Sequence, residues 1–319
     1  MQFSIIIPAK NEQANIGRCL DSILQMDWDN GQYEVIVVDN GSTDRTVAIA
    51  RGKGAQVYQK PECNISGLRN FGASRASGEI LAYIDADCTV ARDWLRQASA
   101  YMFRAEVACF GSPPGVPEGA TWVQTAWFLV RRKREPVGET QWLESMNMFV
   151  RRDAFRSCGG FDETLFTCED YDLSLRLKTS GLVVNDSRIV ATHHGEAATV
   201  RHFFQKELWR GKSNFAGLLQ HGLVLSEIPS LAAPALHCLL LLGIAAALAL
   251  SLKRWSICLL ASMVLWQCLL VMKSIQKQWP APTPARALQL LWLFNVYLVA
   301  RGVAGLPNWH ARIGSRLSA

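Results

Sequence analysis

The sequence predicts an α/β domain with a mostly parallel sheet, followed by a membrane segment. Apolar, β-branched runs at residues 3–8, 33–38 and 79–84 alternate with segments of helical character. Strands and helices that alternate along a chain form parallel sheets through right-handed crossovers. The last 92 residues, 228–319, contain no Asp or Glu and hold long uncharged runs. The first pattern indicates a Rossmann-like sheet, and the second indicates helices in a membrane.

The first strand is expected at residues 3–8, because this run is apolar on both faces, as in a strand at the centre of a sheet. A helix is expected at 11–26, where Ile16, Leu20 and Ile23 recur at helical spacing. By the same criteria, further strands are expected at 33–38, 57–59, 79–84 and 147–151, and further helices at 43–51, 67–77 and 169–178.

The charge is divided unevenly along the chain. The net charge is +6 overall, but residues 1–227 hold 25 basic and 27 acidic side chains. The N-terminal domain is therefore slightly acidic, which argues against nucleic acid as a partner. The excess basic residues lie beside hydrophobic segments, where anionic lipid head groups attract them.

The cysteines and the N-terminus indicate a cytoplasmic domain. The nine cysteines are scattered without any C-x-x-C pair. This usage is typical of reduced thiols, not of a disulfide framework or a zinc site. The first eight residues lack a basic region and a cleavage site, so we expect a buried strand there and no signal peptide.

The C-terminal segment predicts two or three membrane helices. Residues 228–252 are uncharged and long enough to cross a core of about 30 Å. Residues 255–272 are uncharged and just long enough, so the two should form a hairpin at Lys253-Arg254. Residues 287–300 are apolar but short. They either extend through 306 as a third span or lie in the membrane interface.

The segment before these helices can form an amphipathic helix at 202–219, in which aromatic and aliphatic residues alternate with Arg and Lys. It is either an interfacial helix or an ordinary surface helix packed on the domain. We therefore expect a catalytic domain at 1–197, an amphipathic linker at 198–227 and a membrane domain at 228–319. The distribution of Lys and Arg favours a multi-pass protein of the inner membrane, with the catalytic domain on the cytoplasmic side.

A candidate metal site follows the third strong strand, at Asp85-Ala86-Asp87. Ligands of such sheets bind beyond the carboxyl ends of the strands. Two carboxylates there need a neutralising partner, and a divalent cation such as Mg²⁺ or Mn²⁺ prefers oxygen ligands. His193 or His194 could complete the metal shell, and a structural role for either is the alternative.

Other polar residues lie at the same edge of the expected sheet. Asp39 and Asp44 end the second strand, where they either form a turn or accept hydrogen bonds from a nucleobase or a ribose. Glu12 follows the first strand and either caps a helix or contributes to this pocket. Arg69 could bind a phosphate or form a salt bridge to one of these carboxylates.

Glu169-Asp170 is a second acidic pair, at the start of a predicted helix. An acid at this position is often a helix cap. In a cleft it can instead be the general base that takes a proton from an acceptor hydroxyl.

Taken in order, these motifs resemble the family 2 glycosyltransferases of the GT-A fold. The resemblance covers about residues 3–195 and is specific as a set. The motifs are Ser4-Ile-Ile-Ile-Pro8-Ala-Lys-Asn-Glu12, Val37-Val-Asp39-Asn-Gly-Ser-Thr-Asp44, Arg69-Asn-Phe-Gly72, Asp85-Ala-Asp87 and Glu169-Asp170.

The resemblance implies an inverting transfer from a nucleotide-sugar, usually linked to UDP or GDP. It implies that Asp39 contacts the base, in a pocket also lined by Pro8 and Glu12. Asp85 would contact the ribose or the metal, and Asp87 would bind the metal. Asp170 would be the catalytic base, with Glu169 beside it.

Two departures from the family refine this expectation. The Gln-x-x-Arg-Trp motif of processive synthases is absent, since the helix reads Gln205-Lys-Glu-Leu-Trp209-Arg210. A single transfer is therefore expected. Polyprenyl-phosphate sugar synthases, the main alternative, need no base, so the Glu169-Asp170 pair favours a hydroxyl acceptor. We expect this acceptor to be lipid-linked or membrane-proximal, in the synthesis of a cell-envelope glycan.

Two other functions remain as alternatives. A nucleotidyltransferase would have a Gly-rich loop after the first strand, where this chain has Pro8-Ala-Lys-Asn-Glu12. An inactive membrane scaffold would have lost Asp87 or Asp170, and both are present.

Overall fold

The computed structural model describes residues 2–131, 136–165, 167–211, 228–275 and 283–304. The chain divides into two compact units. The first unit contains Met1–Glu118 and Glu135–Glu196, and the second contains Gly119–Arg134 and Ala197–Ala319. Residues 119–131 thus group with the C-terminal helices, although they lie within the sequence of the first unit.

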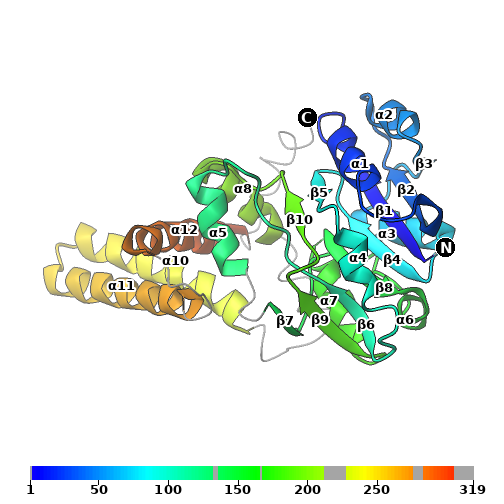
Figure 1. Ribbon diagram of the computed structural model, residues 1–319. Helices are drawn as coiled ribbons and strands as arrows, with labels where there is room; N and C mark the ends of the chain where they lie inside the picture. The colour runs from blue at the N-terminus through cyan, green and yellow to red at the C-terminus, as the bar shows by residue number, and fades with distance from the viewer. Residues whose placement is uncertain (1, 132–135, 166, 212–227, 276–282, 305–319) are drawn as a thin grey trace. The chain divides into compact units, whose positions relative to one another are not determined.

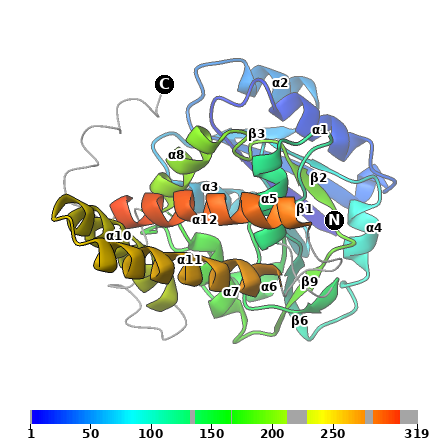
Figure 2. The ribbon, with the colours of Figure 1, turned by 90° about the vertical axis from the view of Figure 1, so that its left-hand side faces the viewer.

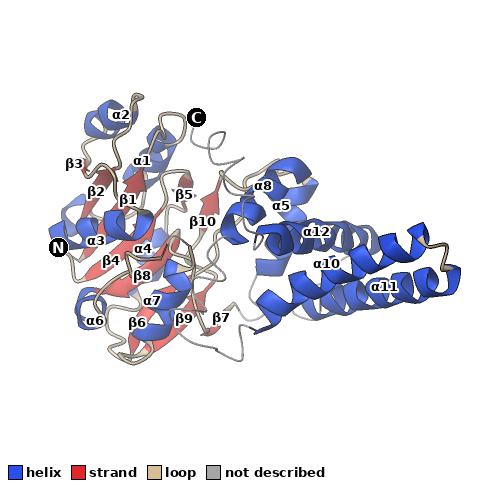
Figure 3. Cartoon of the chain, turned by 180° about the vertical axis from the view of Figure 1, so that it is seen from behind, coloured by secondary structure: helices blue, strands red, loops and turns tan. Residues whose placement is uncertain are grey.

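The first unit contains an eight-stranded sheet in the order β3-β2-β1-β4-β8-β6-β9-β7 (Figures 1 and 3). The strands β3, β2, β1 and β4 run parallel, as the alternating pattern predicts. β8 is antiparallel to both of its neighbours, and β7 is antiparallel to β9. The strands are β1 (Phe3–Ala9), β2 (Tyr33–Asp39), β3 (Gln56–Gln59), β4 (Ile80–Ile84), β6 (Val107–Gly111), β7 (Val137–Glu139), β8 (Asn147–Arg151) and β9 (Leu182–Asp186).

Helices cover both faces of this sheet. α1 (Ile16–Leu24), α2 (Thr46–Gly52) and α4 (Trp94–Ser99) pack on the face that includes Ile5 and Ile7 of β1. α3 (Ile65–Arg75), α6 (Arg152–Ser157) and α7 (Glu169–Leu177) pack on the opposite face, which includes Ile6. Successive residues of β1 therefore enter different hydrophobic layers, which explains why the whole strand is apolar.

A second, two-stranded sheet pairs β5 (Cys88–Val90) with β10 (Ala191–His193) in antiparallel register. His193 lies opposite Cys88 in this pairing. This pairing brings His193 next to Asp87, the second carboxylate after β4, although the two residues are about a hundred positions apart in sequence.

α3 approaches the sheet closely at Gly72. A Cβ atom at this position would lie 2.5 Å from Cγ2 of Ile6 and 3.2 Å from Cγ2 of Val38. Both side chains belong to buried central strands, so neither can move away freely. The absence of a side chain at Gly72 is therefore what allows α3 to lie on β1 and β2.

The second unit is helical, with α5 (Trp122–Arg131), α8 (Val200–Gly211), α10 (Ile228–Ala249), α11 (Lys253–Ile275) and α12 (Pro284–Ala304) (Figure 2). α10 and α11 form the expected hairpin, and α12 contacts each of the other four helices. By length and composition, α10, α11 and α12 could each cross a membrane. α8 covers the start of the expected amphipathic helix, and 212–219 lie outside the described residues.

We expect Gly72→Ala to destabilise the first unit by about 1–3 kcal/mol, since overpacking a close helix–sheet contact has this cost. Gly52→Ala is the matched control, because Gly52 ends α2 and a Cβ there meets nothing within 4 Å. Thermal unfolding of the detergent-solubilised protein measures both. Equal melting temperatures for the two variants would contradict this account of Gly72.

Candidate active site

The carboxyl ends of β1, β2 and β4 border a cleft of about 340 Å³. This is the edge at which ligands of parallel sheets bind. The cleft is lined by residues that come directly after each of the three strands and by the start of α3. The lining residues are Pro8, Ala9, Lys10, Glu12, Asn40, Cys63, Asn64, Ile65, Leu68, Asp85, Ala86 and Asp87.

Asp39 ends β2 and is fully buried. Its Oδ2 accepts hydrogen bonds from the backbone N–H groups of Gly41 and Ser42, at 3.1 and 3.0 Å. Its Oδ1 is buried and has no hydrogen-bond partner among the described residues. Burying a carboxylate oxygen without a hydrogen-bond partner costs free energy. Oδ1 of Asp39 is therefore suited to accept a hydrogen bond from an N–H group of a bound molecule.

Glu12 and Asp44 connect the loops that follow β1 and β2. Asp44 accepts hydrogen bonds from the backbone N–H groups of Thr46 and Gln13, and Glu12 donates its own backbone N–H to Oγ1 of Thr46. The Glu12 side chain accepts from Nδ2 of Asn15 at 2.8 Å. Burial, with the charges of Asp87 and Asp85, raises the pKa of Glu12. Glu12 therefore lines the cleft, and Asp44 holds its rim in place.

Arg69 of α3 connects the two acidic motifs. Its guanidinium donates to Oδ1 of Asp85 at 2.9 Å and to Oε1 of Glu169 at 2.8 Å. The side chain is only 3% exposed and lies over the ring of Phe161, at 5.5 Å from the ring centroid. Of the two roles considered for Arg69, the geometry thus favours the salt bridge, here with two carboxylates at once.

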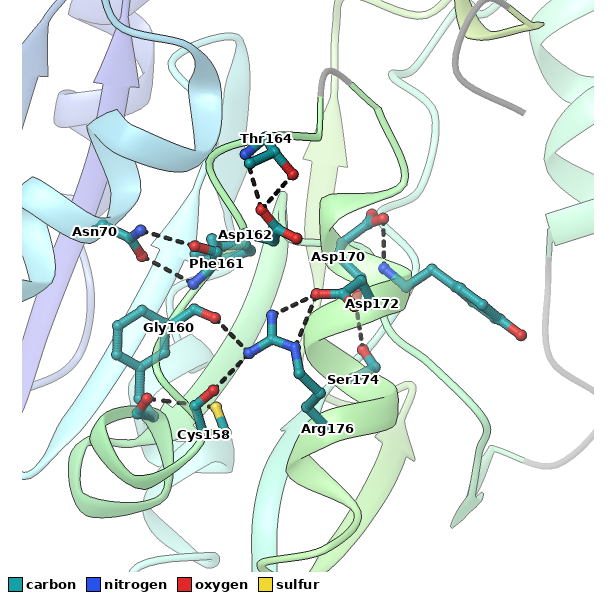
Figure 4. Close-up of polar contacts among 12 residues, drawn as sticks. Asn70, Cys158, Gly160, Phe161, Asp162, Thr164, Asp170, Asp172, Ser174 and Arg176 are labelled. Atoms are coloured by element: carbon teal, nitrogen blue, oxygen red, sulfur yellow. Dashed lines mark hydrogen bonds and ion pairs between the residues drawn. The ribbon is translucent and has the colours of Figure 1, made fainter. Parts of the chain in front are cut away.

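Hydrogen bonds connect the loop at 158–161 to α7, whose first turn contains Asp170 (Figure 4). Arg176 donates to the backbone carbonyls of Cys158 and Gly160, both at 2.7 Å, and pairs with Asp172 one turn earlier on the same helix. The Asn70 side chain exchanges two hydrogen bonds with the backbone of Phe161. The loop at 158–161 is therefore tied to both α3 and α7.

Asp170 lies in an environment that favours its protonated form. Burial first, then the negative charges of Glu169 and Glu144, raise its pKa to about 7. The positive charge of Arg69 opposes this shift but does not cancel it. A carboxylate with a pKa near neutrality is suited to take up a proton and release it again.

Three side chains, Asp87, His193 and Glu196, are connected in a row at the Asp85-Ala86-Asp87 motif. Nε2 of His193 lies 3.0 Å from Oδ2 of Asp87, and Nδ1 lies 3.1 Å from Oε1 of Glu196. These two carboxylates raise the pKa of His193 to about 9, against the opposing effect of burial. His194 lies elsewhere, with Nε2 at 3.0 Å from Oγ1 of Thr89. The His194 backbone N–H donates to the Asp87 carbonyl at 3.0 Å, but within the described residues only the ring of His193 lies against the Asp87 carboxylate.

These residues fit a divalent cation. Asp87 supplies a hard oxygen and His193 an imidazole nitrogen, a combination that Mn²⁺ accepts. Glu196 on Nδ1 is the usual outer partner of a ligating histidine, because it directs the Nε2 lone pair toward the metal. At Gly195 a Cβ would lie 1.9 Å from Oδ2 of Asp87, so any side chain would obstruct this oxygen. Cys88 is close, but burial raises its pKa and keeps the thiol protonated.

Several cleft residues were not expected from the sequence. Glu196 follows His193 by three positions, and this spacing of an acid and a histidine could have suggested it. Lys10, Cys63 and Asn64 line the cleft from loops and from the start of α3. Lys10 lies within the motif Pro8-Ala-Lys-Asn-Glu12, whereas no simple sequence pattern marks Cys63 and Asn64, because their position depends on how the loops close.

Comparison with known proteins identifies the domain. Residues 4–159 match the family model described as Glycosyl transferase family 2. The chain carries a family 2 glycosyltransferase domain. This confirms the family that the motifs indicate, and the transferase domain contains Asp39, Arg69 and both carboxylates of the Asp85-Ala86-Asp87 motif.

Curated relatives match somewhat more than half of this chain. The glycosyltransferase AglE of Haloferax volcanii is 31% identical over 188 residues, which cover 56% of this chain and 62% of that protein. The beta-monoglucosyldiacylglycerol synthase of a Nostoc species is 32% identical over 193 residues, covering 54% of this chain and 40% of that protein. The chain thus matches less than two thirds of the length of these relatives.

Among solved structures, the chain resembles the mannosyltransferase PcManGT from Pyrobaculum calidifontis, determined in complex with GDP-Man and Mn²⁺. The TM-score is 0.60, and the match covers 95% of this chain and 86% of that one. At 19% identity this likeness concerns the fold alone. It confirms that the transferase domain has the GT-A-like fold that the motifs imply.

The raised pKa of Asp170 predicts a pH-dependent cost in stability. The folded protein holds this proton up to a pKa of about 7, whereas the unfolded chain releases it at its ordinary value of 3.8. The contribution of Asp170 to the free energy of unfolding therefore decreases as the pH rises from about 4 to about 7. We expect Asp170→Asn to melt at a higher temperature than the wild type at pH 8.

The same comparison at pH 4 supplies the control, because pH 4 is only just above the ordinary pKa of 3.8 and little of the pH-dependent cost has developed there. The stabilisation by Asp170→Asn should nearly vanish. A shift of equal size at both values of pH would show that the asparagine acts through packing and not through charge.

Proposed function

We propose that this chain is an inverting glycosyltransferase that moves a sugar from a nucleotide-sugar donor to a hydroxyl of a lipid-linked or membrane-proximal acceptor. The observation that supports this most directly is the double ion pair of Arg69. It holds Asp85, beside the candidate metal ligands, and Glu169, beside the candidate base, at one edge of the sheet. The candidate donor site and the candidate base are thereby connected through a single side chain.

The cleft after β1, β2 and β4 is the proposed donor site. The unpartnered Oδ1 of Asp39 would accept an N–H of the nucleobase, and Pro8 and Glu12 would line the pocket. Asp85 would contact the ribose or the metal. The GDP-Man in the similar structure and the family resemblance both support a nucleotide-sugar linked to UDP or GDP.

A divalent cation, Mg²⁺ or Mn²⁺, would be held by Asp87 and His193, with Asp85 close by. When bound, it would offset the negative charge that develops on the departing diphosphate. Glu196 would accept the Nδ1 proton and keep the His193 ring oriented, and the bound cation would displace the proton from Nε2. The Mn²⁺ in the similar structure supports this choice of ion.

Asp170 is the proposed general base. As the acceptor oxygen bonds to the anomeric carbon, the bond from that carbon to the diphosphate breaks, and the hydroxyl proton passes to the Asp170 carboxylate. Attack opposite the leaving group inverts the anomeric configuration. A base with a pKa of about 7 is ionised in a large fraction of molecules at neutral pH and still accepts the proton readily.

A membrane-bound acceptor is supported by the C-terminal helices. Three of them are long and apolar enough to cross a bilayer, and a similar protein is named as a synthase of a glucosyl diacylglycerol. We propose that the transferase domain acts on the cytoplasmic side of the inner membrane. A polyprenyl-phosphate acceptor would need no base, so the environment of Asp170 favours a hydroxyl.

We expect Asp170→Asn to reduce transfer by about 100-fold or more, the typical contribution of a general base, with little change in the KM for the donor. The assay is incorporation of radiolabelled sugar, from a panel of UDP- and GDP-sugars, into a lipid extract. Asp162→Asn is the control, because Asp162 accepts from the Thr164 backbone N–H and an asparagine oxygen can do the same. Full activity of Asp170→Asn would exclude it as the base.

The proposed metal site predicts a difference between adjacent histidines. His193→Ala should lower the affinity for Mn²⁺, so that about tenfold or more metal is needed for half-maximal transfer. His194→Ala should resemble the wild type, since its ring contacts Thr89 instead of Asp87. Metal titration after treatment with EDTA measures both. Undiminished activity in EDTA would remove the metal from the proposal.

A further inference from the structure

Two helices of the second unit are short within the described residues. α5 has 10 residues and the described part of α8 has 12, which correspond to about 15 and 18 Å, against a hydrocarbon core of about 30 Å. The chain also enters α5 from the first unit and returns to it afterwards. Both ends of α5 must therefore be on the same side of the membrane.

α12 packs along these two short helices over most of its length. Near its middle, Phe294 contacts Trp127 of α5, whose ring also contacts Phe203 of α8. Further along, Ala300 and Ala304 form one buried cluster with Leu208 of α8. The stretch from Leu290 to Ala304 is thus covered by α5, whose two ends lie on one side of the membrane, and by the described part of α8.

α8 and α12 approach each other closely at the last residue of α8. A Cβ at Gly211 would lie 2.6 Å from Cβ of Ala304, so the two helices are in direct contact there. The order of contacts is the same on both helices, from Glu207 beside Arg301 to Gly211 beside Ala304. α8 and α12 therefore run side by side, and whatever depth α8 has in the membrane is also the depth of α12.

Ionised side chains lie at this contact. Glu207 of α8 is 1% exposed on its side chain and pairs with Arg301 of α12 at 3.0 Å and with Arg210 at 2.6 Å. One acidic and two basic groups in the hydrocarbon core would be costly. At the level of the lipid head groups they remain hydrated at their edges and face anionic phosphates.

The contacts of α12 with the helical hairpin involve one end of that hairpin. A Cβ at Gly302 would meet Cys238 and the Pro234 carbonyl, in the first half of α10. Asn295 accepts a hydrogen bond from Gln267, about two thirds of the way along α11. Large apolar side chains are exposed along the hairpin as far as its turn, among them Leu248, Leu250, Trp255 and Ile257.

The outward face of α12 suits a membrane surface. Leu288 and Trp292, one turn apart, are 68% and 56% exposed. Tryptophan is enriched where the acyl chains meet the head groups. Buried leucines and Phe294 occupy the opposite face, against α5 and α8.

We propose that α12, together with α5 and α8, lies in the head-group region of one leaflet, and that of these helices only α10 and α11 cross the bilayer. The partner of the Leu288–Trp292 face is the lipid surface. It follows that both ends of the chain are on the same side of the membrane, and that the turn between α10 and α11 is on the other side.

Reporter fusions to the full chain test this topology. Alkaline phosphatase and green fluorescent protein are fused in turn at the N-terminus, after Ala319, and in the turn at Leu252. We expect both ends to give the same reporter response and the turn to give the opposite one. Opposite responses at the two ends would show that α12 crosses, and a turn that matches the N-terminus would show that the hairpin does not.

The depth of α12 gives a second measurement. Spin labels are placed at Trp292→Cys and, for comparison, at Leu242→Cys of α10, which is 67% exposed. Phe103→Cys in the first unit, 94% exposed, is the water-facing reference. We expect the ratio of oxygen to nickel accessibility to be severalfold lower at position 292 than at 242. Equal ratios at these two positions would overturn the proposal.

Discussion

The ion pairs of Arg69 determine how the site is assembled. A guanidinium that is almost fully buried must be neutralised, and it is neutralised by one carboxylate from the end of β4 and another from the start of α7. These two motifs are separated by more than eighty residues in sequence. Since Arg69 can satisfy both only when α3, β4 and α7 are correctly packed, the site forms together with the fold.

The charge that remains after this pairing sets the electrostatics of the candidate site. Arg69 compensates Asp85 and Glu169 but leaves the half-buried Asp170 beside the negative charges of Glu169 and Glu144, and its pKa rises. Asp87 in turn lies against His193, whose other nitrogen lies against Glu196. A fold selected only for stability would not place so many carboxylates at one edge of a sheet. Their cost is consistent with a function that involves a cation and a proton.

The second unit differs from the first in its large exposed apolar surface. Its hairpin exposes large apolar side chains on nearly all sides, which suits lipid and not water. α12 has a similar length but combines an apolar face with an arginine that pairs to a buried glutamate. Length and hydropathy do not distinguish α12 from α10 and α11, whereas the contacts of its side chains do.

The sequence by itself determined the elements whose pattern is local. The apolar runs at β1, β2 and β4, the helical spacing of α1 and the acid-free C-terminus are readable because periods of 2 and 3.6 residues and long uncharged runs need no distant partner. The same holds for the motifs after the strands, because consecutive parallel strands place their carboxyl ends at one edge. Tertiary structure decided the rest. The choice of His193 over His194, the two partners of Arg69, the role of Glu196 and the antiparallel course of β8 all depend on which segments meet. His193 reaches Asp87 across 106 residues of chain, and a contact at that separation is fixed by the packing of the whole domain and not by the residues on either side.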